Sequence, residues 1–211
     1  SGVCVVEADG KLVNASVTRV SEGMEIQTMS EQCVQARKEA LGTILAHHNK
    51  DCVNCFRSES CELQDLLHAY GFTNEPDLPE SDLEEIDTSS LVLIRDNNKC
   101  IKCKRCINVC AKMQAVSAIA ATGEGLDTVI RPSSTAGLAA ASCVNCGQCV
   151  AVCPVGALYE KDGTAVFKQA VADPEKYVVV QVAPAVRASI GECYEFRFWQ
   201  DSRDIENRVI Y

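Results

Sequence analysis

The sequence has few basic residues and no long apolar run, and each shortage excludes a class of protein. Lys and Arg number 20 against 29 Asp and Glu, so the 211 residues carry a formal net charge of −9. Such an acidic chain is poorly suited to nucleic acid, whose phosphates attract dense positive charge. No apolar run reaches the roughly 18–20 residues that a membrane-spanning helix needs. Residues 1–4 lack the basic and then apolar order of a secretion signal, so we expect a reducing compartment.

Cysteine is the residue type that the sequence has in excess. The 14 cysteines make up about 6.6% of the chain, below the roughly 8–10% of disulfide-stabilised secreted proteins. Eleven of them fall into three tight groups, at 52–61, 100–110 and 143–153. In a reducing compartment, thiols grouped in this way bind metal more often than they form disulfides. The sequence therefore predicts metal centres, whereas Cys33 and Cys193 are expected to be unliganded thiols.

The second and third groups form an internal repeat, in which C-x2-C-x2-C-x3-C recurs 43 residues later. In bacterial two-cluster ferredoxins the first three cysteines of such a run bind one 4Fe-4S cluster and the fourth binds the other. The predicted second centre therefore consists of Cys100, Cys103, Cys106 and Cys153. The predicted third centre consists of Cys143, Cys146, Cys149 and Cys110. A zinc ribbon is the alternative, but it uses only two C-x2-C pairs and leaves cysteines of each run unexplained.

The first group holds only three cysteines, so a centre there needs another donor. His48 ends a predicted helix and is placed to supply it, whereas His47 would point roughly 100° away around that helix. The predicted first centre consists of His48, Cys52, Cys55 and Cys61. Three cysteines and one histidine also suit a structural zinc site. The spacing favours an iron–sulfur cluster and leaves zinc open.

Periodicity predicts short elements around these motifs. Strands are expected at Val3–Val6, Leu12–Val13, Val17–Val20, Met24–Thr28, Leu91–Ile94 and Tyr177–Val182, the last one buried, with an Asp9-Gly10 turn joining the first two. Helices are expected at Glu31–His48, at Cys61–Tyr70 with Gly71 closing it, and at Ala165–Ala172. Residues 75–87 hold seven acidic side chains and are predicted to form a solvated connector. Residues 123–142 are predicted to be a loop.

The order of the motifs resembles that of a known protein family. His-x3-Cys-x2-Cys-x5-Cys, an acidic segment and two C-x2-C-x2-C-x3-C runs are similar to the N-terminal electron-transfer region of iron-only (FeFe) hydrogenases, above all the NAD(P)-linked type. The large iron–sulfur subunit of complex I and NAD-dependent formate dehydrogenase have similar modules. Residues 178–192 look like the opening of the hydrogenase catalytic domain, so the resemblance covers residues 1–192. It implies a 4Fe-4S cluster at the first centre and three such clusters in all.

Two departures from the family pattern limit what we expect of this chain. The family begins with a β-grasp domain whose 2Fe-2S cluster needs four cysteines. Here Cys4 matches one of them, whereas Ser1 and Ser16 stand where two others would be, so we expect no 2Fe-2S cluster. The tail 193–211 holds five of the 11 aromatic residues and diverges from the pattern. We expect a chain truncated at both ends, without the catalytic cysteine loops.

The predicted fold class is α+β, built from consecutive small modules. These are a remnant of the β-grasp domain (1–28), a helical domain with the first centre (29–74), an acidic linker (75–90), a two-cluster ferredoxin-like domain (91–176) and the start of a catalytic domain with a divergent tail (177–211).

The expected function is electron relay between a ferredoxin or NAD(P)H-linked donor and a hydrogen-activating site, with no hydrogen turnover by this chain alone. A piece of complex I or of formate dehydrogenase is one alternative, and a zinc-stabilised interaction module without redox activity is another. The expected partners are redox proteins, a flavin or NAD(P)-binding subunit and a catalytic subunit or domain. The expected location is the cytoplasm, or the hydrogenosome of a eukaryote.

A basic patch lies beside the predicted second centre in an otherwise acidic protein. It consists of Lys99, Lys102, Lys104 and Arg105. Such a patch either keeps a loop solvated or forms a docking surface for an acidic electron donor.

Overall fold

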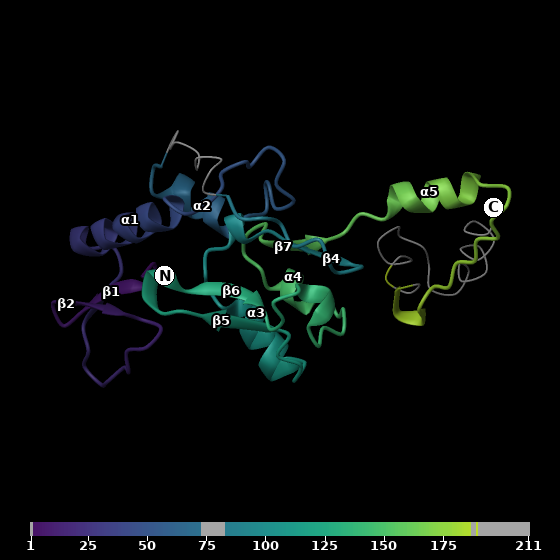
Figure 1. Cartoon of the computed structure of the whole chain (residues 1–211). Helices are drawn as coiled ribbons and strands as arrows, with labels where there is room; N and C mark the ends of the chain where they lie inside the picture. Colours follow the sequence, from purple (N-terminus) through teal and green to yellow (C-terminus); the bar gives the residue numbers. More distant parts are fainter. Residues whose placement is uncertain (1, 73–82, 187–188, 190–211) are drawn as a thin grey trace. The chain divides into compact units, whose positions relative to one another are not determined.

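The computed structural model describes residues 2–72, 83–186 and 189, and the chain divides into two compact units, residues 1–161 and 162–211 (Figure 1). The first unit combines helices with three small antiparallel sheets, so the α+β class is confirmed. Among the described helices, none has the length and apolar character to cross a bilayer. Residues 73–82, which include the first part of the predicted linker, lie outside the described residues, as do Ser1, Cys193 and the tail beyond it.

The N-terminal residues form a three-stranded sheet in the order β2-β1-β3. Its strands are β1 (Val5–Ala8), β2 (Lys11–Asn14) and β3 (Ile26–Gln27). Asp9 and Gly10 connect β1 to β2 with φ of 49° and 77°, the two left-handed residues of a type I′ hairpin turn. The predicted hairpin and its turn are therefore confirmed, and β3 is a shorter version of the predicted last strand.

The strand predicted at Val17–Val20 is wrong. The chain turns there instead, because Thr18 donates both its backbone N–H and its hydroxyl to the carbonyl of Asn14, at 3.1 and 2.8 Å. Both valine side chains are about four-fifths exposed. A β-branched run alone does not make a strand when no neighbouring strand pairs with it.

Helix α1 (Glu31–Leu45) begins where the sequence predicts. The Ser30 hydroxyl accepts a hydrogen bond from the Cys33 N–H at 3.3 Å and caps its N-terminus. The helix ends three residues before His48, because residues 46–48 bend away from helical geometry in a turn, in which the His48 N–H bonds to the Leu45 carbonyl at 3.2 Å. This turn directs the chain toward the first cysteine group.

Helix α2 (Glu62–Ala69) confirms the second predicted helix and its C-terminal glycine. Gly71 has φ +74°, and the N–H of Phe72 reaches back to the Leu67 carbonyl at 2.9 Å. This is a Schellman ending, which needs a residue in the left-handed region after the helix.

The repeat region is closed by its first and last strands, β4 (Leu93–Arg95) and β7 (Leu158–Glu160), which pair antiparallel. One short helix lies in each copy of the repeat, α3 (Arg105–Asn108) and α4 (Gln148–Ala151). A π-helical turn at Val109–Met113 extends α3. Each helix lies within a cysteine run, whereas β4 precedes the first run and β7 follows the second.

The segment predicted to be a loop at 123–142 is only partly so. Strand β6 (Val129–Pro132) pairs with β5 (Ile119–Thr122), and single 3-10 turns form at Gly125–Asp127 and Leu138–Ala140, with a third at Asn97–Lys99. Ile130 is 1% exposed. The burial of this side chain and of Leu138 in the core outweighs the Gly, Ala and Ser content that predicts a loop.

One apolar core joins the N-terminal helices to the repeat region. It includes Leu41 of α1, Leu63 of α2, Leu93 of β4, Ile119 of β5, Ile130 of β6, Val150 of α4 and Leu158 of β7. The described part of the acidic segment also packs against the repeat region. The backbone N–H of Asp87 donates to the Arg95 carbonyl, and the backbone N–H of Arg95 donates to the Asp87 carbonyl, both at 2.9 Å. Residues 83–90 are therefore not merely a solvated connector.

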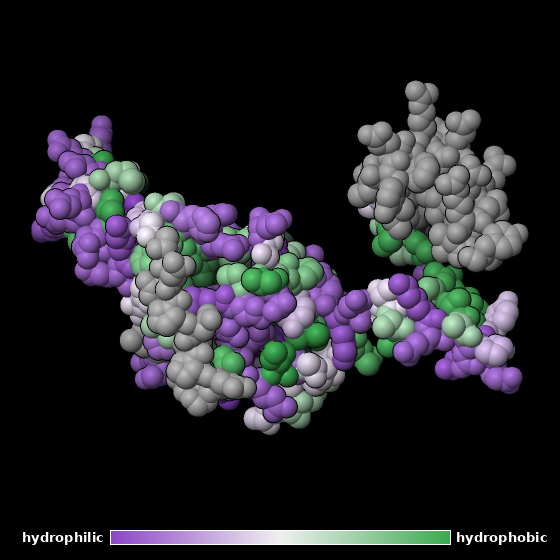
Figure 2. Space-filling view, turned by 90° about the horizontal axis from the view of Figure 1, so that it is seen from above, coloured by the Kyte–Doolittle hydropathy of each residue, from purple (hydrophilic) through white to green (hydrophobic). Residues whose placement is uncertain are grey.

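The second unit contains α5 (Thr164–Ala172), which confirms the predicted helix. The strand predicted at Tyr177–Val182 is wrong: these residues form no strand, and Tyr177 and Val179 are 94% and 76% exposed. Figure 2 shows apolar residues on the surface of this unit. A buried strand needs neighbours, and the described residues of this unit provide none.

Candidate metal centres

The two cysteine runs of the repeat adopt the same backbone path. In each copy the residue before the second cysteine and the residue after it have left-handed φ: 57° at Lys102 and 63° at Lys104, and 56° at Asn145 and 72° at Gly147. Left-handed residues reverse the local direction of the chain. They turn successive thiols toward one side, which a regular helix or strand through the same spacing would not do.

Each run lines its own small cavity, and in both cases a cysteine from the other run completes the lining. One cavity is lined by Cys100, Cys103, Cys106 and Cys153, together with Arg95, Lys104 and apolar side chains. The other is lined by Cys110, Cys143, Cys146 and Cys149, together with glutamines and apolar side chains. The structure thus brings together the same two sets of four cysteines that the spacing predicts for the second and third centres.

The innermost thiols are buried where ionisation is unfavourable. Burial, together with the neighbouring cysteines, raises the pKa of Cys106 to about 12 and that of Cys149 to about 11, although the charge of Arg95 acts to lower the pKa of Cys106. Burial also raises the pKa of Cys153. Crowded, buried thiols of this kind are ionised only when a cationic centre compensates their charge. This donor chemistry fits an iron–sulfur cluster.

Backbone groups donate hydrogen bonds to sulfur at the third centre. The N–H of Ala118 lies 3.2 Å from the Sγ of Cys110, and the N–H of Asn145 lies 3.4 Å from the Sγ of Cys143. Hydrogen bonds to sulfur stabilise the thiolate and are one way in which a protein sets a cluster's potential.

The cysteines of the first centre lie close enough to affect one another. Burial raises the pKa of Cys52, and the thiols of Cys55 and Cys61 raise it further. Cys61 occupies the N-cap position of α2, at the start of that helix. The charge of Lys99 acts to lower the pKa of both Cys52 and His48.

His48 and His47 differ sharply in their surroundings. His48 is 7% exposed, and its Nδ1 is buried without a hydrogen-bond partner. Burial lowers its pKa to about 4, with help from the charges of Lys99 and Lys50, so the imidazole is neutral at pH 7. His47 is exposed, and its Nδ1 lies 3.1 Å from the Thr43 carbonyl. A neutral ring with an unused nitrogen is what a metal ligand requires.

The first centre packs directly on the repeat. A Cβ added to Gly156 would lie 2.5 Å from the Sγ of Cys55, so only glycine fits against that sulfur. Arg57 donates from Nη2 to the Val150 carbonyl at 2.9 Å, and the N–H of Glu62 bonds to the Pro154 carbonyl at 3.1 Å. These contacts tie the first cysteine group to the chain around Cys153.

The predicted basic patch is not a free cationic surface. Lys99 is only 9% exposed, and its Nζ donates to the Asp51 carbonyl at 3.5 Å. Arg105 forms a two-pronged ion pair with Glu62, at 2.6 and 2.7 Å. The charges predicted to attract an acidic partner are thus partly used inside the protein, because the first cysteine group packs against this side of the repeat.

Cys4 and Cys33 lie away from these centres. The Sγ of Cys4 is 3.2 Å from the hydroxyl of Ser16, which lowers the pKa of the thiol. The two positions that the family pattern pairs are therefore neighbours, with serine in place of one cysteine. Cys33 is fully buried, and its Sγ lies 3.6 Å from the Gln27 carbonyl.

Within residues 2–72, 83–186 and 189, no three His, Cys, Asp or Glu side chains come together tightly enough to hold one ion. A zinc ion binds four donors at about 2.0–2.3 Å from one point. A cubane has four irons at separate corners and accepts thiolates that are further apart.

Comparison with known proteins finds a family model that matches each of the two cysteine-rich regions. Residues 37–76 match the NADH-ubiquinone oxidoreductase-G iron-sulfur binding region, and residues 99–157 match a 4Fe-4S dicluster domain. The chain is 41% identical over 193 residues to the NADP-reducing hydrogenase subunit HndD of Solidesulfovibrio fructosivorans, covering 90% of this chain and 33% of that protein. It is 36% identical over 201 residues to iron hydrogenase 1 of Clostridium pasteurianum, covering 94% and 35%.

Other relatives share a shorter part of the chain. An NADH-quinone oxidoreductase subunit of Rhizobium meliloti (strain 1021) is 35% identical over 163 residues, 74% of this chain and 18% of that protein. The fold is similar to a chain in the crystal structure of an NAD+-reducing NiFe hydrogenase in the H2-reduced state, with a TM-score of 0.67, 29% identity, and coverage of 75% of this chain and 68% of that one. The chain spans about a third of the length of the two hydrogenase relatives.

Proposed function

We infer that this chain is an electron-transfer module of an NAD(P)-linked hydrogenase-like oxidoreductase. It belongs to the iron–sulfur proteins that share this region with NADP-reducing and iron hydrogenases. The family matches cover both cysteine regions, and the hydrogenase relatives match 90% or more of the chain. A 4Fe-4S cluster, when bound, takes up and releases one electron without making a bond to substrate. The protein's part is to hold such clusters and to set how easily each is reduced.

The observation that carries this proposal is the pair of cysteine-lined cavities. We propose that the second centre holds one cluster through Cys100, Cys103, Cys106 and Cys153. The third centre would hold another through Cys110, Cys143, Cys146 and Cys149. The exchange of one cysteine between the two runs supports this assignment over a zinc ribbon, which has no use for it.

The first centre is proposed to hold a third cluster through His48, Cys52, Cys55 and Cys61. The buried, unpartnered Nδ1 of His48 and its low pKa support a neutral imidazole ligand. Replacing one thiolate by a neutral ring makes a cluster less negative and therefore easier to reduce. A 2Fe-2S cluster near Cys4 is not part of the proposal, because Ser16 occupies the neighbouring position and a hydroxyl is a poorer iron ligand.

The partners are proposed from the relatives. The named relatives include a subunit of an NADP-reducing hydrogenase, so we propose that a ferredoxin or a flavin-containing, NAD(P)-binding protein donates electrons. A catalytic domain or subunit would accept them. A role in complex I or in a formate dehydrogenase is the alternative, and it is less well supported because those relatives match 74% of the chain. The five-module division and a cytoplasmic location remain predictions.

Anaerobic reconstitution tests the proposal. The three centres offer 12 ligands in three groups of four, so we expect about 12 irons per chain and three distinct signals by EPR after reduction with dithionite. About eight irons with one zinc would mean that the first centre is a structural site. Zinc at all centres, with no reducible signal, would establish the interaction module instead.

A further inference from the structure

The second centre has a feature that the third centre lacks: a buried cation. Arg95 on β4 is 3% exposed, and it lines the cavity of Cys100, Cys103, Cys106 and Cys153. Its charge acts on the buried thiol of Cys106. The side chains that line the third cavity are cysteines, glutamines and apolar groups, with no Lys or Arg among the described residues. Two copies of one motif therefore differ in the charge beside them.

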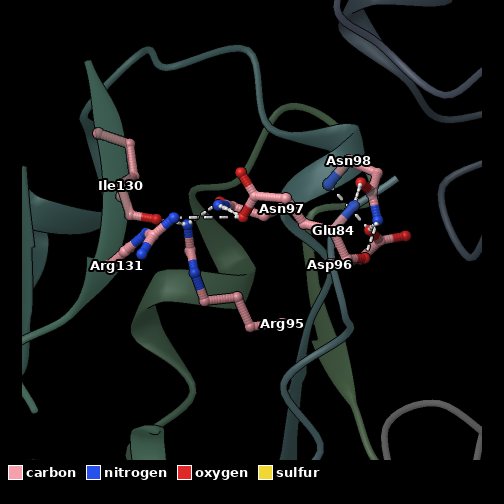
Figure 3. Close-up of polar contacts among 7 residues, drawn as sticks. All are labelled: Glu84, Arg95, Asp96, Asn97, Asn98, Ile130 and Arg131. Carbon is pink, nitrogen blue, oxygen red and sulfur yellow. Dashed lines mark hydrogen bonds and ion pairs between the residues drawn. The ribbon is translucent and has the colours of Figure 1, made fainter. Parts of the chain in front are cut away.

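The hydrogen bonds of Arg95 leave part of its guanidinium unused. Nη2 donates to the Ile130 carbonyl and to Oδ1 of Asn97, the latter at 2.7 Å (Figure 3). Nη1 is buried and has no hydrogen-bond partner. The neighbouring Arg131, by contrast, forms an ion pair with Glu84 at 3.7 Å (Figure 3).

Arg95 has no carboxylate as a counterion among the described residues. The carboxylate of Asp87 senses its charge, but it accepts hydrogen bonds from the backbone N–H groups of Ser89 and Leu138, at 3.0 and 2.9 Å. Burying a cation without a counterion is strongly unfavourable. The cavity that Arg95 lines is therefore suited to a group with negative charge.

We propose that Arg95 is the counterion of the cluster at the second centre and raises its reduction potential above that of the third centre. Four thiolates make such a cluster anionic, and reduction adds one electron's negative charge. A buried guanidinium stabilises the more negative state more strongly, because the surroundings have a low dielectric constant. An electron that reaches either of these two clusters then resides mainly on the second one, because its reduction potential is higher. This inference rests on the proposed function, since it needs both clusters.

Other cations near the second centre have weaker effects. Lys104 also lines the cavity but is exposed, and Arg105 is half exposed and paired with Glu62. Water and a counterion screen such charges. Lys99 is buried, but its Nζ is directed to the Asp51 carbonyl on the side of the first centre. Arg95 is thus the buried cation that faces the second centre.

A redox titration followed by EPR tests the proposal on the reconstituted 211-residue protein. We compare Arg95→Gln with Arg131→Gln, which removes an exposed cation from β6, next to the Ile130 carbonyl that Arg95 contacts. In Arg95→Gln we expect the ratio of reduced to oxidised second centre at fixed potential to fall at least tenfold, a shift of about −59 mV for one electron. The signals of the other two centres should not move, and Arg131→Gln should move none. The second-centre signal is assigned by its change in Cys106→Ser.

Each other outcome has a definite meaning. If the second centre of Arg95→Gln carries all of its iron and its reduction potential is unchanged, this proposal is overturned and the proposed function stands. A wild-type protein that binds no clusters would overturn both. If Arg95→Gln does not assemble the second cluster, Arg95→Lys decides. Recovery by Lys, which keeps the charge but not both hydrogen bonds, supports the counterion. Loss of the second cluster in both variants would mean that the site needs the hydrogen bonds to Ile130 and Asn97 rather than the charge, and would overturn the proposal.

Discussion

At the scale of single residues, burial separates side chains that the sequence presents as equivalent. His47 and His48 are neighbours, yet one is exposed and hydrogen-bonded to its own helix, and the other is buried with a free nitrogen. Lys99 and Lys104 belong to one basic run, yet only Lys99 is buried. How strongly each side chain acts on a centre therefore depends on what packs against it.

Replacing His48 should remove one cluster. In His48→Ala, we expect about four of the roughly 12 irons to be lost, because three thiolates do not complete a cubane's ligand set. His47→Ala is the matched control and should keep full iron content, since its ring faces solvent. Iron and sulfide analysis after anaerobic reconstitution measures both. Full loading of His48→Ala, with loss in His47→Ala, would reverse our ligand assignment.

Gly156 belongs to the repeat region that packs against the first centre, so it offers a second test of that centre. Gly156→Ala would place a methyl group 2.5 Å from the Sγ of Cys55, so we expect the first centre to lose its cluster or show an altered EPR signal. Gly42→Ala, in α1, meets no atom within 4 Å and should leave the signal unchanged, while stabilising the helix by about 0.5–1 kcal/mol. Unaltered spectra of Gly156→Ala would show that Cys55 can move away freely.

At the scale of elements, short strands and helices are held by contacts between segments rather than by their own length. The N-terminal sheet has three short strands, and a sheet of this size has little stability by itself. Arg37 of α1 attaches it to the helices: Nε and Nη2 donate to the Val5 carbonyl at 2.9 and 2.6 Å, and Nη1 donates to the Tyr70 hydroxyl at 3.1 Å.

The sheet should therefore depend on Arg37. We expect residues 2–28 to exchange amide hydrogens faster than the cluster regions in the wild type, and faster still in Arg37→Met, with a local loss of about 1 kcal/mol per broken hydrogen bond. Lys38→Met changes an exposed neighbour on the same helix and should have no effect. Hydrogen exchange with mass spectrometry measures this. Equal protection of Val5–Ala8 in both variants would show that Arg37 does not hold the sheet.

At the scale of the whole molecule, the centres and the core are one body. The first cysteine group packs against the chain around Cys153, and a single apolar core runs from α1 to β7. The loss of one cluster is therefore expected to loosen its neighbours. The three proposed centres thus lie within one compact unit, whereas the described part of the second unit has its apolar side chains exposed.

The reconstituted chain should carry electrons without activating hydrogen. After Cys153 these 211 residues contain one further cysteine, Cys193, and a further cubane alone needs about four thiolates. We expect dithionite to reduce the protein, and the reduced protein to pass electrons to a dye or a ferredoxin, without evolving or consuming hydrogen. Gas chromatography and dye reduction measure the two activities. Hydrogen turnover that persists through purification and disappears in Cys193→Ser would contradict this view.

The sequence by itself determined how the candidate donors are grouped, because ligand spacing is a local property of the chain. The exchange of one cysteine between the two repeat copies was a prediction from the pattern of two-cluster ferredoxins. The sequence also determined the hairpin turn at Asp9-Gly10 and the glycine ending of α2, where a backbone conformation needs a particular residue. Only the tertiary structure decided that Val17–Val20 and Tyr177–Val182 form no strand, since a strand exists through its neighbours. Only packing between distant segments decided that Arg95, Lys99 and His48 are buried, and burial determines how strongly a charge or an unused nitrogen acts on a centre.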